Sequence, residues 1–248
     1  MKGAFRRVIR IATRMKEGST GEARAVVEDD YHHFRVVVHY DAGQVISTST
    51  EALRSPYDLC SAAGQRLHEL VGMPLSGKMA AAFRVTDARH QCTHQFDIAA
   101  LAVAAAARGI RQRRYDMVIP DSADGRVSAR LQRDGSDVLE WQMDGDIILE
   151  PHPYTRRSIG SGFTDWVANQ LSEDESEAAL VLRRGVFISA GRRMEKSIPS
   201  GARPTGGCWV QQPERNRLAV AHPDSRQNFS QMPERLTAAD NEWIRFAA

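Results

Sequence analysis

The pattern of β-branched and polar residues predicts a β-hairpin over residues 33–50. Both arms of this segment consist mainly of β formers, and Asp41-Ala42-Gly43 between them is typical of a tight turn. After Ser55-Pro56, leucine and alanine recur at helical spacing over residues 57–71, and Gly72 follows as a stop signal. The pattern therefore predicts a hairpin followed by a short amphipathic helix.

A second predicted helix is apolar on nearly all of its faces. Its central residues, 98–107, are all alanine, leucine, isoleucine or valine, and Gly109 follows them. A helix of this composition is normally buried. The polar residues that lead into it, 86–97, are therefore expected to enter the protein interior or to line a cleft, where they need hydrogen-bond partners.

Three Asp-Gly pairs predict an antiparallel meander in the middle of the chain, because Asp-Gly is a strong hairpin signal. Strands are expected over residues 115–119, 125–132, 138–143 and 146–150, and helices over residues 163–171, starting near Ser161 or Thr164, and 173–189, starting near Ser172. Together these elements predict an α+β fold. An antiparallel sheet, made of the hairpin and the meander, is expected to pack around the buried Ala-rich helix.

The composition shifts to Pro, Gly, Gln, Asn and Arg from Ser197 onward. We therefore expect a core domain of residues 1–196 and an irregular C-terminal extension of residues 197–248, with short strands only at 208–210 and 218–220. The extension is expected to pack on the core, because four large aromatic residues need burial. These are Trp209, Phe229, Trp243 and Phe246.

The 248 residues include 33 basic and 31 acidic side chains, which are interspersed along the chain. This balance gives no reason to expect nucleic acid or an anionic membrane surface as a partner. The longest apolar run, 98–107, is about half as long as a membrane span, and Arg10 and Arg14 interrupt any apolar core of a signal peptide. With three cysteines far apart in the sequence, the chain is predicted to be cytoplasmic, with reduced thiols.

Two histidine clusters are candidates for chemistry. His90 and His94 are four residues apart, and on a helix this spacing presents two imidazoles to one metal ion. The remaining ligands of such a site would come from Asp29, Asp30, His32 or His33. In the alternative interpretation, His90 is an exposed first-turn residue and His94 is a hydrogen-bonded interior histidine.

The second cluster, residues 28–33, lies at the start of the predicted hairpin. Successive residues of a strand point to opposite faces, so at most half of these acids and histidines can enter one pocket. A carboxylate beside a histidine raises the basicity of the imidazole, as a general base requires, and we place Asp30 and His33 in these roles. The alternative is a solvated entrance to the strand.

Neighbouring segments supply the candidate substrate contacts. Cys92 and His94 are two residues apart, and a helix directs such residues to different faces, so a Cys/His nucleophile is not expected and Cys92 is interpreted as a buried thiol. Arg54 follows the hairpin, where it could neutralise a phenolate or a carboxylate. The candidate substrate-binding residues are Tyr31, Arg54, Tyr57, Cys92 and Thr93.

Several of these motifs resemble the bacterial family known as domain of unknown function 2889. The resemblance is carried by residues 1–7 and 28–36, by Thr86-Asp87-Ala88-Arg89, and by Cys92-Thr93-His94 with Phe96-Asp97, and it extends to Cys208 and Gln212-Pro213. It covers most of the chain. The position of His90 is more often Gln in that family, which implies that His94 acts without it.

The resemblance also implies an activity, because some members of the family are associated with breakdown of lignin-derived aromatic dimers. It implies a carbon–carbon lyase that releases formaldehyde from a hydroxymethyl side chain of a phenolic small molecule, with no metal or organic cofactor. In this hypothesis His94 or His33 removes the hydroxyl proton, Asp30 orients the base, and Arg54 or Tyr31 stabilises the phenolate. The alternatives are a non-catalytic small-molecule-binding or dimerisation module and a metal-dependent hydrolase. A homodimer is left open.

Overall fold

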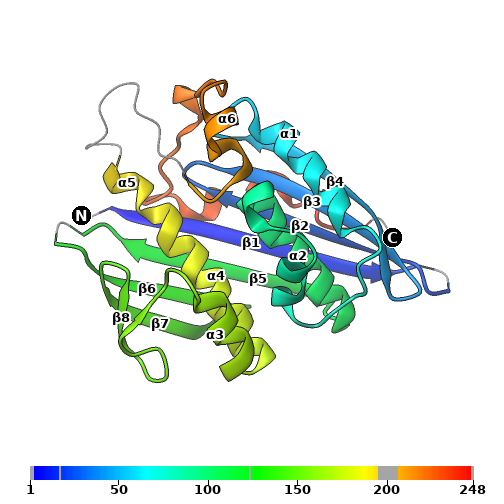
Figure 1. The fold of residues 1–248 in the computed structure, drawn as a ribbon, viewed down its shortest axis with the longest axis horizontal. Coiled ribbons are helices and arrows are strands. Elements are labelled where there is room, and N and C mark those ends of the chain that lie inside the picture. The colour runs from blue at the N-terminus through cyan, green and yellow to red at the C-terminus, as the bar shows by residue number, and fades with distance from the viewer. Residues whose placement is uncertain (1–2, 17, 123, 195–205, 247–248) are drawn as a thin grey trace.

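A nine-stranded antiparallel sheet forms the centre of the computed structural model, which describes residues 3–16, 18–122, 124–194 and 206–246 (Figure 1). In spatial order the strands are β4-β3-β2-β1-β5-β6-β7-β8-β9. Their bounds are β1 (Ala4–Met15), β2 (Gly21–Asp29), β3 (His33–Asp41), β4 (Gln44–Arg54), β5 (Gln112–Pro120), β6 (Arg126–Arg133), β7 (Ser136–Asp144), β8 (Ile147–Glu150) and β9 (Arg157–Ser158). The described helices are α1 (Cys60–Gly64), α2 (Thr93–Ala107), α3 (Phe163–Gln170), α4 (Glu173–Ser189), α5 (Gly191–Met194) and α6 (Pro213–Asn216), and the predicted α+β class is confirmed.

The predicted hairpin and meander are both present. Strands β3 and β4 pair antiparallel from His33 opposite Arg54 to Asp41 opposite Gln44. Strands β5 to β8 pair in sequence order, and each turn between them contains one of the Asp-Gly pairs. Local turn chemistry therefore predicts these pairings correctly.

Strands β1 and β2 lie side by side at the centre of the sheet, and the sequence pattern does not predict them. Both faces of β1 are covered. Phe5 and Ile9 belong to the main hydrophobic core, whereas Val8 packs against Phe229 and Leu236 of the C-terminal extension. A strand with two buried faces lacks the simple alternation of apolar and polar residues by which a strand is recognised.

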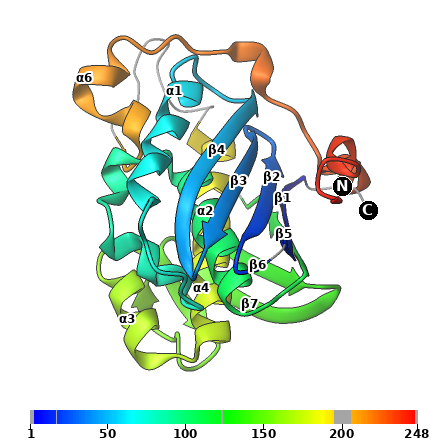
Figure 2. The ribbon, with the colours of Figure 1, turned by 90° about the vertical axis from the view of Figure 1, so that its right-hand side faces the viewer.

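Two helices cover one face of the sheet, here called the inner face (Figure 1, Figure 2). Helix α2 packs on β1, β2 and β3, and α4 packs on β5, β6, β7 and α3. The polar residues at the start of α2, Thr93 to Gln95, are buried together with its apolar residues, as expected, whereas Asp87, Arg89 and His90 before the helix are exposed, contrary to the expectation for residues 86–97. Polar side chains are thereby placed inside the protein next to the end of β2.

The C-terminal extension covers part of the opposite, outer face. Phe229 is buried there, and Ile244 packs against Ala12 and Val26 from β1 and β2. Trp243 also packs against this second apolar cluster. The extension therefore lies on the core as expected, and the predicted boundary between residues 196 and 197 falls outside the described residues.

Several predicted helix ends and minor elements are wrong. The Ala-rich helix begins only at Thr93, and residues 88–90 before it form a separate 3-10 turn. Residues 57–71 form α1 followed by a 3-10 helix, Gln65–Leu70, instead of one helix. Ser172 caps α4 through a capping box as expected, but the N-cap of α3 is Gly162, whose φ of 79° suits glycine.

The C-terminal strand predictions also fail. Trp209–Gln211 is a 3-10 turn, and near residues 218–220 the chain makes only an isolated bridge between Ala221 and Tyr57. Short apolar runs do not by themselves distinguish a strand from a packed turn. Among the residues described, no helix combines the length and the apolar composition that crossing a bilayer requires.

Candidate active site

The turn after β2 and the first turn of α2 bring two histidines into contact. The rings of His32 and His94 stack with centroids 3.6 Å apart and planes inclined by 24°. Both side chains are buried, and Phe34 lies beside them, 5.7 Å from His32 and 6.0 Å from His94 between ring centroids. The structure thus joins two remote segments that the sequence singles out, with His32 as the partner of His94.

Asp29, the last residue of β2, orients His32. Its Oδ1 accepts hydrogen bonds from the backbone N–H of Tyr31 at 2.8 Å, from the backbone N–H of His32 at 2.9 Å and from His32 Nδ1 at 3.0 Å. Because an ionised carboxylate only accepts, Nδ1 carries the proton, and Nε2 is the atom of the neutral His32 ring that can take up another. This carboxylate–imidazole arrangement suits a general base.

Arg7 on the neighbouring strand β1 neutralises Asp29. The two residues lie directly opposite each other, Arg7 Nη1 donates to Asp29 Oδ2, and neither side chain has any exposed surface. Burial alone would raise the pKa of Asp29, but the adjacent His32 and Arg7 outweigh burial and hold this pKa well below its usual range. Asp29 is therefore ionised at neutral pH.

His94 is kept uncharged. Burial lowers its pKa well below the usual value, and the neighbouring His32 and Arg7 lower it further. Its Nε2 is buried and has no hydrogen-bond partner among the described residues. Three residues further along α2, Asp97 pairs with Arg184 of α4, Nε to Oδ2 at 2.5 Å, which adds a second guanidinium to the surroundings of the pair.

Asp29, His32 and His94 each bring a potential ligand atom within 4.8 Å of the others, so they form a candidate metal set. Two features oppose metal binding. Asp29 already accepts four hydrogen bonds, one of them from Arg7, and stacked rings direct their in-plane lone pairs side by side instead of towards one point. His90 is exposed on the 3-10 turn before α2, so the predicted His90/His94 pair does not form.

His33 does not meet His94, contrary to the sequence hypothesis. Its Nε2 lies 2.8 Å from Asp240 Oδ2 and its Nδ1 lies 3.5 Å from Glu28 Oε1, and Arg35 Nε donates to Asp240 Oδ1 at 2.6 Å. The chain turns at residues 30–32, so strand alternation cannot be extended across this segment. His33 therefore belongs to a buried ionic cluster, Glu28–His33–Asp240, which attaches the C-terminal extension to the sheet.

Asp30 does not contact either histidine of the stacked pair through its carboxylate. Its Oδ2 pairs with Arg192, and its Oδ1 accepts a hydrogen bond from the backbone N–H of Phe229 at 3.3 Å. Burial raises the pKa of Asp30, although the Arg192 guanidinium opposes this shift. The carboxylate that contacts the stacked pair is instead that of its neighbour Asp29, through His32 Nδ1.

Arg54 holds the turn that carries the site. Its guanidinium makes five hydrogen bonds: to the backbone carbonyls of Asp29, Asp30, His32 and Ser225 and to the carboxylate of Glu28. These bonds occupy both terminal nitrogens of the side chain. The geometry therefore favours a positioning role for Arg54 over the substrate contact predicted from sequence.

The other predicted contacts lie at different distances from the stacked pair. Tyr31 is next to it, with its ring centroid 6.1 Å from that of His32, and its buried hydroxyl has no partner among the described residues. Cys92 is the buried N-cap residue of α2, and Thr93 is its buried first residue. Tyr57 lies in the bridge to Ala221 instead.

The three cysteines are free thiols, and all three lie in or against the main hydrophobic core. Burial raises the pKa of Cys60 to about 12, and charges on the nearby Cys92 and Cys208 would raise it further. Burial also raises the pKa of Cys92 and that of Cys208. Thiols with raised pKa values are weak nucleophiles, which agrees with the interpretation of Cys92 as a structural residue.

From the sequence, Arg7 is not identified as a site residue, and Asp29 and His32 are considered only as additional ligands of a metal site. Arg7 itself could have pointed to the buried ion pair, because in a strand it lies on the same face as Phe5 and Ile9, which are in the main core. An arginine in the apolar register of a strand needs a buried counter-charge. That reasoning requires β1 to be recognised as a strand first.

Fold and site together define an α+β protein with a buried carboxylate–histidine pair and a second, neutral histidine stacked on it. No protein-family model matches the chain, and no curated protein matches it. The resemblance to domain of unknown function 2889 therefore stays a prediction. Any proposal of function rests on the site geometry and on that resemblance.

Proposed function

We propose that this protein is a cofactor-independent carbon–carbon lyase that releases formaldehyde from the hydroxymethyl side chain of a lignin-derived phenolic dimer. The observation that carries the proposal is the hydrogen bond of 3.0 Å from His32 Nδ1 to Asp29 Oδ1. This bond fixes the tautomer in which Nε2 of His32 accepts a proton. His32 is therefore the general base and Asp29 its orienting partner.

His94 contributes a neutral imidazole beside this base. Its unpartnered Nε2 is available to hydrogen-bond the oxygen of the substrate hydroxyl group or of the departing aldehyde. The pKa of His94 lies well below its usual value because of burial and of the nearby His32 and Arg7, so this ring does not compete for the proton. The two histidines thus have different roles, set by their surroundings.

The reaction requires a base and a substrate that can accept electrons. In the phenolate form of such a dimer, the electron pair of the phenolate oxygen expels a benzylic oxygen substituent with its bonding electrons, which gives a quinone methide. His32 then removes the proton of the side-chain hydroxyl group, the carbon–oxygen double bond of formaldehyde forms, and the adjacent carbon–carbon bond breaks. Its electron pair forms the new carbon–carbon double bond and restores the phenolate, and the proton on His32 passes to the oxygen that left.

Tyr31 is the residue best placed to contact the phenolic part of the substrate. Its ring lies beside His32 and its hydroxyl group is buried without a partner among the described residues. A phenol or phenolate oxygen could occupy that hydrogen-bonding position. Arg54 supports the site indirectly, through the turn that holds Asp29 and His32.

The proposal is tested by incubating the protein with a panel of phenolic dimers that carry a hydroxymethyl side chain and by measuring the formaldehyde released. We expect release by the wild type, and a loss of about 10²–10⁴-fold in His32→Gln. His90→Gln is the matched control, because His90 is exposed and outside the site. Normal turnover in a folded His32→Gln variant would reject His32 as the base.

The two alternative functions, a binding module and a metal-dependent hydrolase, predict different results with the same purified protein. A binding module would take up a dimer without releasing aldehyde. A metal-dependent hydrolase is favoured only by the proximity of Asp29, His32 and His94, and elemental analysis of the purified protein would reveal a stoichiometric transition metal. Aldehyde release that persists after treatment with a chelator would reject the hydrolase.

A further inference from the structure

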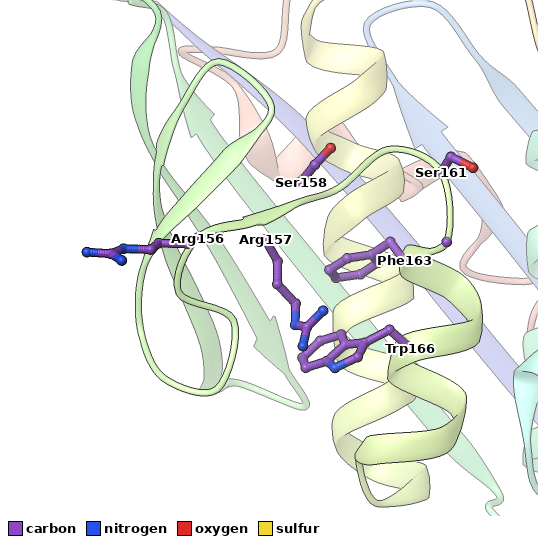
Figure 3. A pocket seen from close by; sticks show the side chains of 7 residues that line it. Arg156, Arg157, Ser158, Ser161, Phe163 and Trp166 are labelled. Atoms are coloured by element: carbon purple, nitrogen blue, oxygen red, sulfur yellow. The ribbon is translucent and has the colours of Figure 1, made fainter.

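A cavity lies between the segment around β9 and the start of α3, away from the histidine site (Figure 3). Its volume is about 330 Å³, within the range of small-molecule sites. Two arginines, two serines, a glycine and two aromatic residues line it, and none of them belongs to the histidine site. The cavity is therefore a separate candidate for ligand binding.

The central side chain of this cavity is Arg157. Its guanidinium carbon lies 3.8 Å from the ring centroid of Trp166, and Figure 3 shows it lying over that ring, whereas Arg156 points away. Trp166 is itself fixed, because it packs against Phe163 and Tyr154 with ring centroids 5.7 Å apart in both cases. An aromatic support thus holds an otherwise mobile cation in one position.

The hydrogen-bonding capacity of Arg157 is unused. Among the described residues, Arg157 makes no ion pair and no side-chain hydrogen bond, and no acidic residue lines the cavity. A guanidinium presents several N–H donors in a planar fork, and this geometry matches the oxygens of a phosphate or a carboxylate. The charge at the cavity therefore favours an oxyanion.

The wall of the cavity is held in place by its own hydrogen bonds. Arg183 of α4 donates to the carbonyls of Ile159 and Gly160, at 2.5 and 3.1 Å. Ser158 Oγ donates to Asp146 Oδ2 at 2.5 Å and accepts a bond from the Gly160 N–H at 3.0 Å. A wall that is ordered before a ligand arrives lowers the entropy cost of binding.

We infer that this cavity is a binding site for the oxyanion group of a small organic molecule. Arg157 binds the phosphate or carboxylate group, and the rest of the ligand lies in the cavity beside Phe163 and Ser161. The site is independent of the proposed lyase reaction. Its failure would therefore leave the proposed function unaffected.

Isothermal titration calorimetry at constant ionic strength tests the inference with three probes: phenyl phosphate, benzoate and inorganic phosphate. We expect saturable one-site binding of phenyl phosphate or benzoate. The probe that binds with the higher affinity shows whether the site prefers a phosphate or a carboxylate group. Arg157→Ala should weaken this binding by about tenfold or more, and Arg157→Lys, which keeps the charge but loses the planar fork, by less. Arg89→Ala is the control, because it removes an exposed positive charge elsewhere.

Three outcomes would overturn the inference: no saturable binding of any probe, equal affinities in the wild type and Arg157→Ala, or binding of inorganic phosphate alone. In the last case the cavity would contribute nothing to binding of the organic part of a ligand. Arg157 is exposed, so its variants should fold, and circular dichroism checks this. A second measurement on the wild type is the NMR shift of the Trp166 indole N–H during the titration. It should move with the organic probe.

Discussion

Arg7 and Asp29 form an ion pair at the centre of the sheet in which both side chains are completely inaccessible to solvent. They lie directly opposite each other on β1 and β2, and Asp29 also holds His32. The candidate base is therefore connected to the most buried charges of the fold. This connection makes the stability of the protein and the geometry of the site depend on the same carboxylate.

Removing either partner of this pair should be strongly destabilising, and removing both should cost less than the sum of the two single effects. We expect Arg7→Met to lower the free energy of unfolding by about 3–5 kcal/mol, because it leaves Asp29 buried without its counter-charge. Urea unfolding of Arg7→Met, Asp29→Asn and the double variant gives the coupling energy, which we expect to be about 2 kcal/mol. Additive effects would show that the pair does not interact as described.

The lowered pKa of His94 predicts a loss of stability on the acid side of neutrality. Unfolding restores an ordinary histidine, with a pKa of about 6.5, whereas the folded state binds this proton only at much lower pH. The unfolded state therefore gains a proton first as the pH falls below about 6.5, and stability decreases by at most about 1.4 kcal/mol per pH unit through this group. The contribution is absent at higher pH.

His94→Gln removes this dependence, which can be checked by urea unfolding at a series of pH values between 7 and 5. We expect a shallower slope in His94→Gln than in the wild type. His90→Gln, at an exposed position, should keep the wild-type slope. Parallel slopes in the wild type and His94→Gln would mean that His94 titrates normally in the folded protein.

The fold divides into parts that local sequence determines and parts that it does not. The meander is predictable because each of its hairpins carries its own turn signal, such as Asp134-Gly135 between β6 and β7. Strand β1 cannot be predicted in this way, because the residues that cover its outer face, Phe229 and Leu236, come from the far end of the chain. No local window contains both sides of that contact.

The site divides in the same way. The sequence identifies two segments that the fold brings into contact, because polar residues before a buried helix must find partners inside the protein. The pair proposed within them, His33 and Asp30, does not contact His94, because strand alternation is assumed across residues 28–33 and the chain actually turns between Asp29 and His33. The alternation of side-chain direction predicts which residues share a face only within a continuous strand.

Arg54 is expected to act through the turn that it holds. Arg54→Ala removes five hydrogen bonds and should lower the free energy of unfolding by about 2 kcal/mol or more, measured by urea unfolding. If the proposed lyase reaction is observed, kcat should fall while KM changes little, because substrate does not contact this side chain. Arg89→Ala serves as the exposed control, and a wild-type stability of Arg54→Ala would contradict the positioning role.

Asp240 fixes the C-terminal extension to the sheet, because its carboxylate lies 2.8 Å from His33 Nε2 and 2.6 Å from Arg35 Nε. Burial alone would raise the pKa of Asp240, but the bonds from His33 and Arg35 lower it below its usual value. A carboxylate whose folded pKa is lowered stabilises the protein above its unfolded pKa of about 4, and this stabilisation is lost as the pH falls through and below that value. Acid should therefore loosen the extension.

Asp240→Asn should reproduce this loosening at neutral pH, because the amide keeps the shape of the side chain but not its charge. We expect the free energy of unfolding to fall by about 3 kcal/mol and limited proteolysis after residue 230 to become faster. Asp224→Asn is the matched control, since Asp224 is exposed on the same extension. Equal proteolysis rates in the two variants would show that the ionic cluster around His33 does not hold the extension, and that the apolar contacts of Phe229 and Ile244 suffice.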